Sequence, residues 1–168
     1  MLTFSFPAGR PLQILCLGAH SDDIEIGCGA TLLTLAHTLP QVQVHWVVFT
    51  ASGERRQEAL DSAHDFLANI QKKEVQLESF RDGFLPYTGA QVKDVFETLK
   101  QQLIPDVIFT HARHDLHQDH RLLCELTWNT WRNHLILEYE IPKYDGDLGV
   151  PNFFVPVTEA RARLNTEL

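Results

Sequence analysis

Residues 13–23 read QILCLGAHSDD, an apolar run that stops at a cluster of polar side chains. Its first part, Gln13–Ala19, ends in small residues and is typical of a strand buried within a parallel sheet. From Asp22 to Leu39, apolar residues recur at helical spacing, so a helix is expected directly after the strand. The stretch therefore predicts a strand-to-helix turn that carries one histidine, one serine and two aspartates.

The same alternation continues along the chain. β-Branched and apolar runs predict further strands at 42–50, 74–80, 107–110 and 135–141. Helical spacing predicts helices at 54–70, 89–103 and 117–134, and the start of another near Thr158. Strands that alternate with helices build a mostly parallel sheet with helices on both faces, so we expect an α/β, Rossmann-like fold. Because no repeat or linker divides the chain, we treat residues 1–168 as a single domain.

Composition narrows the class of protein. The 14 basic and 22 acidic residues give a net charge of −8, which argues against nucleic-acid binding. No apolar run approaches the roughly 20 residues of a transmembrane helix, and the N-terminus lacks the pattern of a signal peptide. The three cysteines, Cys16, Cys28 and Cys124, are widely spaced among apolar neighbours, as expected for buried, reduced thiols. We therefore expect a cytoplasmic protein.

The first polar cluster, His20 to Asp23, follows the carboxyl end of the first predicted strand, where open α/β sheets bind their ligands. Helix capping would account for Ser21 and one aspartate, but not for a second aspartate and a histidine at the same edge. The glycines of Gly27–Gly29 fall inside the predicted helix and not in the turn, so a dinucleotide fingerprint is disfavoured. Small residues there are expected to let the helix lie close to its neighbours.

The second cluster lies at 110–121, after the fourth predicted strand, and holds four of the nine histidines in ten residues. His117 and His120 share one helix face if the helix begins near His117. The alternative is a polar loop whose histidines only cap and form hydrogen bonds, but both clusters are expected at the same sheet edge. Imidazole and carboxylate ligands suit catalytic Zn²⁺, although Fe²⁺, Co²⁺ or Ni²⁺ would also be accepted.

Together the two clusters resemble the motifs of the LmbE-like, or PIG-L, family of zinc-dependent N-deacetylases. The family's Ala-His-Pro-Asp-Asp motif with a glycine-rich continuation stands here as AHSDDIEIGCG at 19–29, and its His-Pro-Asp-His motif stands as HQDH at 117–120. Ser21 and Gln118 replace the two prolines, neither of which is a ligand. The resemblance runs from about Pro11 to Val157. Many relatives extend further at the C-terminus, so a truncated C-terminus and completion by a partner subunit both stay open.

The resemblance implies roles for five residues. His20, Asp23 and His120 would bind the metal ion. Asp22 would act as the general base that deprotonates water. His117 would stabilise the developing oxyanion or protonate the leaving amine.

The resemblance also implies a substrate: an N-acetyl amino sugar or an N-acetylglucosaminyl conjugate, a small molecule or glycoconjugate. Either Arg55 or Arg56, in the loop after the second predicted strand, would hold it. Two alternatives remain at this point, a metal-dependent phosphoesterase and a non-catalytic sugar- or nucleotide-binding module. Trp46, Trp128 and Trp131 would stack on a sugar or, as we favour, pack in the core. A homo-oligomer is plausible for so small a sheet domain.

Overall fold

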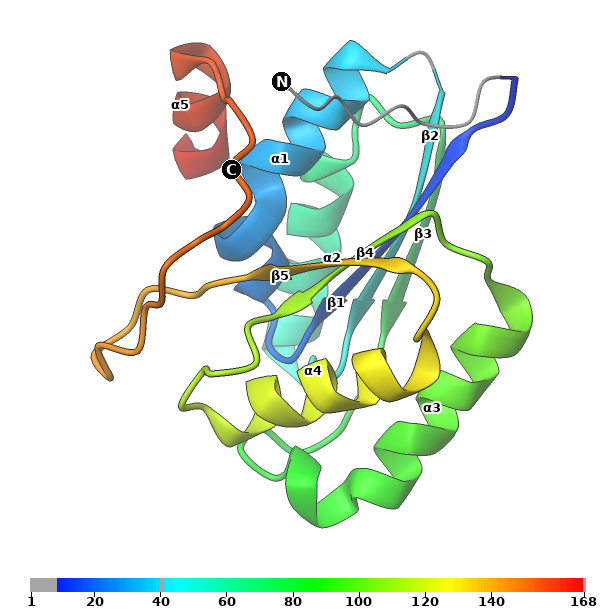
Figure 1. Ribbon diagram of the computed structural model, residues 1–168, viewed down its shortest axis with the longest axis vertical. Helices are drawn as coiled ribbons and strands as arrows, with labels where there is room; N and C mark the ends of the chain where they lie inside the picture. Colours follow the sequence, from blue (N-terminus) through cyan, green and yellow to red (C-terminus); the bar gives the residue numbers. More distant parts are fainter. Residues whose placement is uncertain (1–8, 40, 168) are drawn as a thin grey trace.

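The computed structural model describes residues 9–39 and 41–167, and its centre is one five-stranded parallel sheet (Figure 1). The strand order is β3-β2-β1-β4-β5. All four strand pairings are parallel. The strands are β1 (Leu12–Gly18), β2 (Val42–Val48), β3 (Lys72–Leu77), β4 (Val107–His111) and β5 (Leu135–Tyr139). This arrangement confirms the predicted α/β, Rossmann-like fold.

Helices connect the strands at the predicted places. They are α1 (Asp23–Thr38), α2 (Glu54–Phe66), the 3₁₀ helix η1 (Leu85–Thr88), α3 (Gly89–Gln102), α4 (Gln118–Thr130) and α5 (Glu159–Glu167). Within the described ranges no helix is long and apolar enough to cross a membrane.

Two predicted helices end earlier than their apolar spacing indicated. We predicted that α2 would continue to Ile70, but a turn follows it, in which the Ile70 amide donates to the carbonyl of Leu67. Likewise α4 ends at Thr130, and the Trp131 side chain is buried beyond its end. Apolar side chains in both turns still enter the core, so their spacing resembles that of a helix although the helix has ended.

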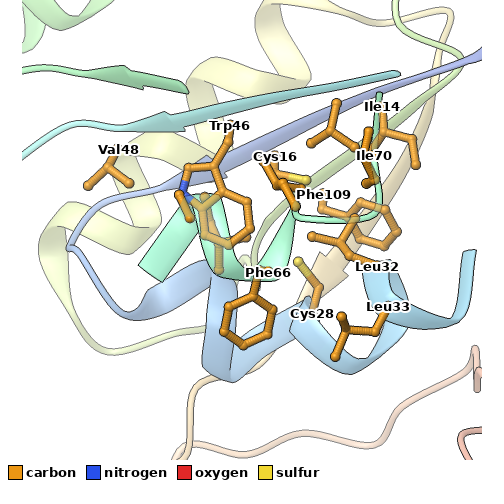
Figure 2. Packing of buried hydrophobic residues seen from close by; sticks show 14 of the residues in the cluster. Ile14, Cys16, Cys28, Leu32, Leu33, Trp46, Val48, Phe66, Ile70 and Phe109 are labelled. Carbon is orange, nitrogen blue, oxygen red and sulfur yellow. The ribbon is translucent and has the colours of Figure 1, made fainter. Parts of the chain in front are cut away.

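The helices cover both faces of the sheet in two layers. On one face, α1 and α2 enclose a core that includes Trp46, Phe66 and Cys28, together with residues of β1 and β4 (Figure 2). On the other face, α3 and α4 enclose a second core that includes Leu15 and Leu17 of β1 and Ile108 of β4. The three cysteines are free and buried, as predicted, and α5 lies beside α1.

The strand order creates a ligand site by topology. The chain adds β2 and β3 on one side of β1 and then crosses over to add β4 and β5 on the other side. The connections that leave β1 and β4 therefore diverge toward opposite faces of the sheet and leave a crevice between them. Open α/β sheets bind ligands at this switch point. Both polar clusters of the sequence lie there.

Two glycines of α1 allow close helix packing, as expected from their position inside the helix. A Cβ atom at Gly27 would lie 2.1 Å from Cδ2 of Tyr139, and one at Gly29 would lie 2.6 Å from Cε1 of Phe66. The Tyr139 hydroxyl is fixed in turn, because it donates a 2.7 Å hydrogen bond to the Leu17 carbonyl. The first turns of α1 are therefore held tightly against β5 and α2.

Gly27→Ala is expected to lower the free energy of unfolding by about 1–3 kcal/mol, because the buried Tyr139 ring must shift to admit the new methyl group. Urea unfolding followed by circular dichroism measures the change. Gly89→Ala is the matched control, since a Cβ there meets nothing within 4 Å. Equal stability of the two variants would contradict the close approach.

Candidate active site

Loops at the carboxyl ends of four strands converge on one cleft. His20 to Asp23 follow β1, Arg55 opens α2 after β2, and Asp82 follows β3. His117 and His120 come from the start of α4, after β4. All of these residues line a single cleft of about 770 Å³, so the two clusters of the sequence meet in space.

The three predicted ligand side chains lie close together, with the Asp23 carboxylate facing both histidine rings. Nδ1 of His20 lies 3.1 Å from Nε2 of His120 and 3.3 Å from Oδ2 of Asp23. Nε2 of His120 lies 3.5 Å from Oδ1 of Asp23. Ligand atoms that surround a tetrahedral Zn²⁺ at about 2.0–2.1 Å are roughly 3.4 Å from one another. The separations therefore fit a divalent metal ion.

A carboxylate fixes the orientation of His120. Its Nδ1 lies 2.9 Å from Oδ2 of Asp115, which directs the Nε2 lone pair to the centre. Asp115 is itself held, because its Oδ1 accepts a 2.7 Å bond from the backbone amide of His117 and its Oδ2 lies 3.0 Å from Nζ of Lys143. Asp115 is therefore the carboxylate that holds the His120 ring in place.

Asp115→Asn is expected to weaken zinc binding about 10- to 100-fold, because carboxylates that orient metal-binding histidines contribute on that scale. Competition against a chelating dye at constant pH measures the affinity. The exposed Asp145→Asn serves as the control, since it removes the same charge outside the cleft. An unchanged affinity in Asp115→Asn would exclude this supporting role.

The electrostatics of the centre favour positive charge. Burial lowers the pKa of His20, but the hydrogen bond and charge of Asp23 outweigh it, together with Asp82 and Asp119, and raise that pKa to about 9. Burial raises the pKa of Asp23, but the adjacent histidines outweigh it and hold that pKa well below its usual range. Two facing ring nitrogens 3.1 Å apart need a proton or a cation between them. The centre is thus suited to hold a cation.

His111 belongs to the site, although the sequence assigned it no role. It is the last residue of β4, it is fully buried, and its ring stacks on His120 with centroids 3.8 Å apart. Its Nε2 accepts a 3.0 Å hydrogen bond from the Ala19 amide. Burial lowers the pKa of His111 to about 4, so the ring is neutral. His111 therefore packs against the His120 ring and links the end of β4 to the loop after β1.

The two predicted catalytic residues both line the cleft. Asp22 precedes α1, its side chain is exposed, and it makes no capping hydrogen bond, so the capping alternative does not apply to it. His117 caps α4, and its Nδ1 accepts from the Asp119 amide at 3.3 Å, which leaves the proton on Nε2. Burial and the nearby His120 and His20 lower the pKa of His117. A pKa lowered in this way favours the neutral ring, which can donate a hydrogen bond from Nε2.

Of the two arginines that the sequence left as alternatives, the structure places one in the cleft. Arg55 lines the cleft, with Nη1 3.7 Å from Oδ2 of Asp82. Arg56 points elsewhere, because its Nη1 donates a 2.7 Å bond to the carbonyl of Leu77. Asp82 was not recognised from the sequence, and its Oδ1 lies 3.1 Å from Nε2 of His20. Arg55 and Asp82 therefore form a polar pair beside His20, at the edge of the proposed metal-binding cluster.

The tryptophans do not form a sugar-stacking surface in this cleft. Trp46 and Trp131 are buried in the two cores, as we favoured. Trp128 lies on α4, where its Nε1 donates to Glu138, and it lines a different pocket.

The fold and the cluster define an α/β protein with His/Asp groups that could hold a metal ion at the switch point of a parallel sheet. The family model of PIG-L, described as GlcNAc-PI de-N-acetylase, matches residues 15–131, so the chain belongs to the PIG-L family. An uncharacterised deacetylase of Escherichia coli (strain K12), YaiS, is 31% identical over 145 residues, which span 80% of this chain and 77% of that protein.

Solved structures share the fold. The conserved protein TT1542 of Thermus thermophilus superposes with a TM-score of 0.72 at 20% identity, over 93% of this chain and 76% of that one. The N,N'-diacetylchitobiose deacetylase of Pyrococcus horikoshii gives a TM-score of 0.68 at 24% identity, over 92% and 67%. The zinc-inhibited form of the teicoplanin deacetylase Orf2 gives 0.73 at 14% identity, over 92% and 81%.

These comparisons confirm the resemblance read from the two motifs, and the chain is a deacetylase of this family. The phosphoesterase and the non-catalytic binding module are correspondingly disfavoured. The matched span, 15–131, includes both polar clusters and the arginine loop.

Proposed function

We propose that this chain is a zinc-dependent N-deacetylase that hydrolyses the acetamide of an N-acetyl amino sugar or N-acetylglucosaminyl conjugate. The observation that supports it most strongly is the convergence of two ring nitrogens on one carboxylate. His20 Nδ1 and His120 Nε2 lie 3.1 Å apart, and each lies within 3.5 Å of one oxygen of Asp23, Oδ2 for His20 and Oδ1 for His120. These atoms would hold the ion. When bound, Zn²⁺ supplies Lewis-acid chemistry, polarising an acyl carbonyl and making water more acidic.

Asp22 is the general base in this proposal. Its exposed carboxylate stands beside the centre without a capping bond, so it is free to accept a proton from the attacking water. The adjacent Asp23 is held differently, because its Oδ2 accepts a 2.6 Å hydrogen bond from the His20 amide. The two neighbouring aspartates therefore take separate roles, one as base and one as ligand.

His117 is the group that stabilises the developing oxyanion. With Nδ1 bonded to the Asp119 amide, its Nε2–H can donate to the acyl oxygen as that oxygen becomes negative. The proton that Asp22 takes from the attacking water is then given to the amine nitrogen as the C–N bond breaks, so that acetate and the amine leave. Arg55 and Asp82, which line the same cleft beside His20, provide a donor and an acceptor for the hydroxyl groups of a sugar.

Incubation of the zinc-loaded protein with N-acetylglucosaminyl conjugates tests the proposal. Acetate and a new primary amine are expected to appear in equal amounts, quantified by enzymatic acetate assay and amine labelling. Phosphomonoesters and phosphodiesters serve as the parallel substrates. Release of phosphate without acetate would reverse the assignment in favour of the phosphoesterase.

A further inference from the structure

A buried carboxylate beside the proposed metal centre has no role in the mechanism above. Glu25 lies in the first turn of α1 and is only 9% exposed. Its Oε1 accepts a 2.8 Å hydrogen bond from the Ser62 hydroxyl of α2. Its Oε2 is buried and has no hydrogen-bond partner within residues 9–39 and 41–167. Glu25 lines the same cleft as His20 and Asp23, and therefore lies next to any molecule bound there.

An unpartnered buried carboxylate oxygen needs an explanation, because burying a polar group without a hydrogen bond is unfavourable. A second buried oxygen without a partner lies in the same cleft. It is Oδ1 of Asn165 in α5, which has no hydrogen-bond partner within the described ranges. A Cβ atom at Gly29, one turn after Glu25, would lie 2.4 Å from that oxygen. Among the residues that the structure describes, the wall formed by α1, α2 and α5 therefore has two acceptors without a donor.

The charged side chains of the cleft are also mostly acidic. Besides Asp23, the cleft is lined by the carboxylates of Asp22, Glu25 and Glu58, and the described residues give none of these three a lysine or arginine partner. The arginine of the cleft, Arg55, lies beside Asp82. A ligand that carries donors and positive charge would complement this wall.

We propose that Glu25 forms a subsite for a positively charged amino group that the substrate carries in addition to its acetamide. An ammonium group has three donors and no acceptor, and its hydrogen bond to a carboxylate is charge-assisted. The preferred substrates are then N-acetylated compounds that already hold one free amine, such as a partly deacetylated amino-sugar conjugate. This inference rests on the proposed deacetylase function.

Paired substrates test the subsite. Each pair consists of an aminoalkyl and an alkyl N-acetylglucosaminide of the same chain length, with linkers of two to four carbons to cover the reach to Glu25. The zinc-loaded wild type is expected to favour the aminoalkyl member of at least one pair by roughly tenfold in kcat/KM, and less at high salt. Glu25→Gln keeps the shape and removes the charge, so the preference is expected to fall to about one while the alkyl substrate changes little.

Glu125→Gln is the matched control, because it removes the same charge from an exposed residue of α4 that does not line the cleft. It is expected to keep the preference. No preference in the wild type at any linker length, or an equal loss in both variants, would overturn the subsite while leaving the deacetylase intact. If no glycoside released acetate, the proposed function would fail instead. Calorimetric binding of the same pairs to wild type and Glu25→Gln would then still decide the inference about Glu25.

Discussion

Asp22→Asn is expected to lower kcat for acetamide hydrolysis by about a thousandfold while the zinc content stays unchanged. The amide has nearly the same shape as the carboxylate but cannot accept a proton from water. Asp22 makes no capping hydrogen bond and is exposed, so the change is not expected to disturb α1. Single-turnover acetate release and metal analysis on the same preparation measure the two quantities.

Asp65→Asn is the control for this experiment, since it alters an exposed aspartate of α2 that does not line the cleft. Its kcat is expected to equal that of the wild type. An Asp22→Asn enzyme that retained its kcat would remove Asp22 as the base. A variant that lost its zinc together with its activity would make Asp22 a ligand and not a base.

His120→Ala is expected to reduce bound zinc from about one ion per chain to less than about 0.1, and to abolish acetate release. The variant removes Nε2, one of the three atoms at the centre, along with the ring that links Asp115 to it. Metal analysis after exhaustive dialysis gives the content, and circular dichroism verifies that the variant is folded.

The matched variant His64→Ala removes an exposed histidine of α2 that does not line the cleft. It is expected to keep full zinc and full activity. Undiminished zinc in a folded His120→Ala protein would place the ion elsewhere, for example among His20, Asp82 and Asp119, which also bring ligand atoms close together.

The sequence alone was sufficient to predict the site residues that follow the ends of strands. His20 and Asp23 follow β1, and His120 follows β4, so topology alone brings them to one crevice. The strands were recognised for a similar reason, because their runs of apolar residues are continuous. Only their ends were displaced, as for the predicted strand at 74–80, which the structure has at Lys72–Leu77.

Features that depend on helix rotation or on distant contacts were not predictable. Arg55 and Arg56 are adjacent in the first turn of α2 and point about 100° apart, so the cleft admits one of them, and only the packing of α2 decides which. Asp82 comes from a loop that Asp119 holds through the amides of Gly83 and Leu85, a contact across more than thirty residues. Glu25 has no neighbour in sequence that indicates its burial.

Zinc titration of the chelator-treated protein, with acetate release from an N-acetylglucosaminyl conjugate followed at each addition, directly tests the metal-dependent mechanism. No activity is expected without metal, and then a linear rise that reaches its maximum at about one zinc ion per chain. In the same titration, Asp22→Asn is expected to bind the ion with equal stoichiometry and to stay inactive. Full acetate release by the metal-free protein, or activity unrelated to bound zinc, would show that His20, Asp23 and His120 do not hold an ion that activates the reaction.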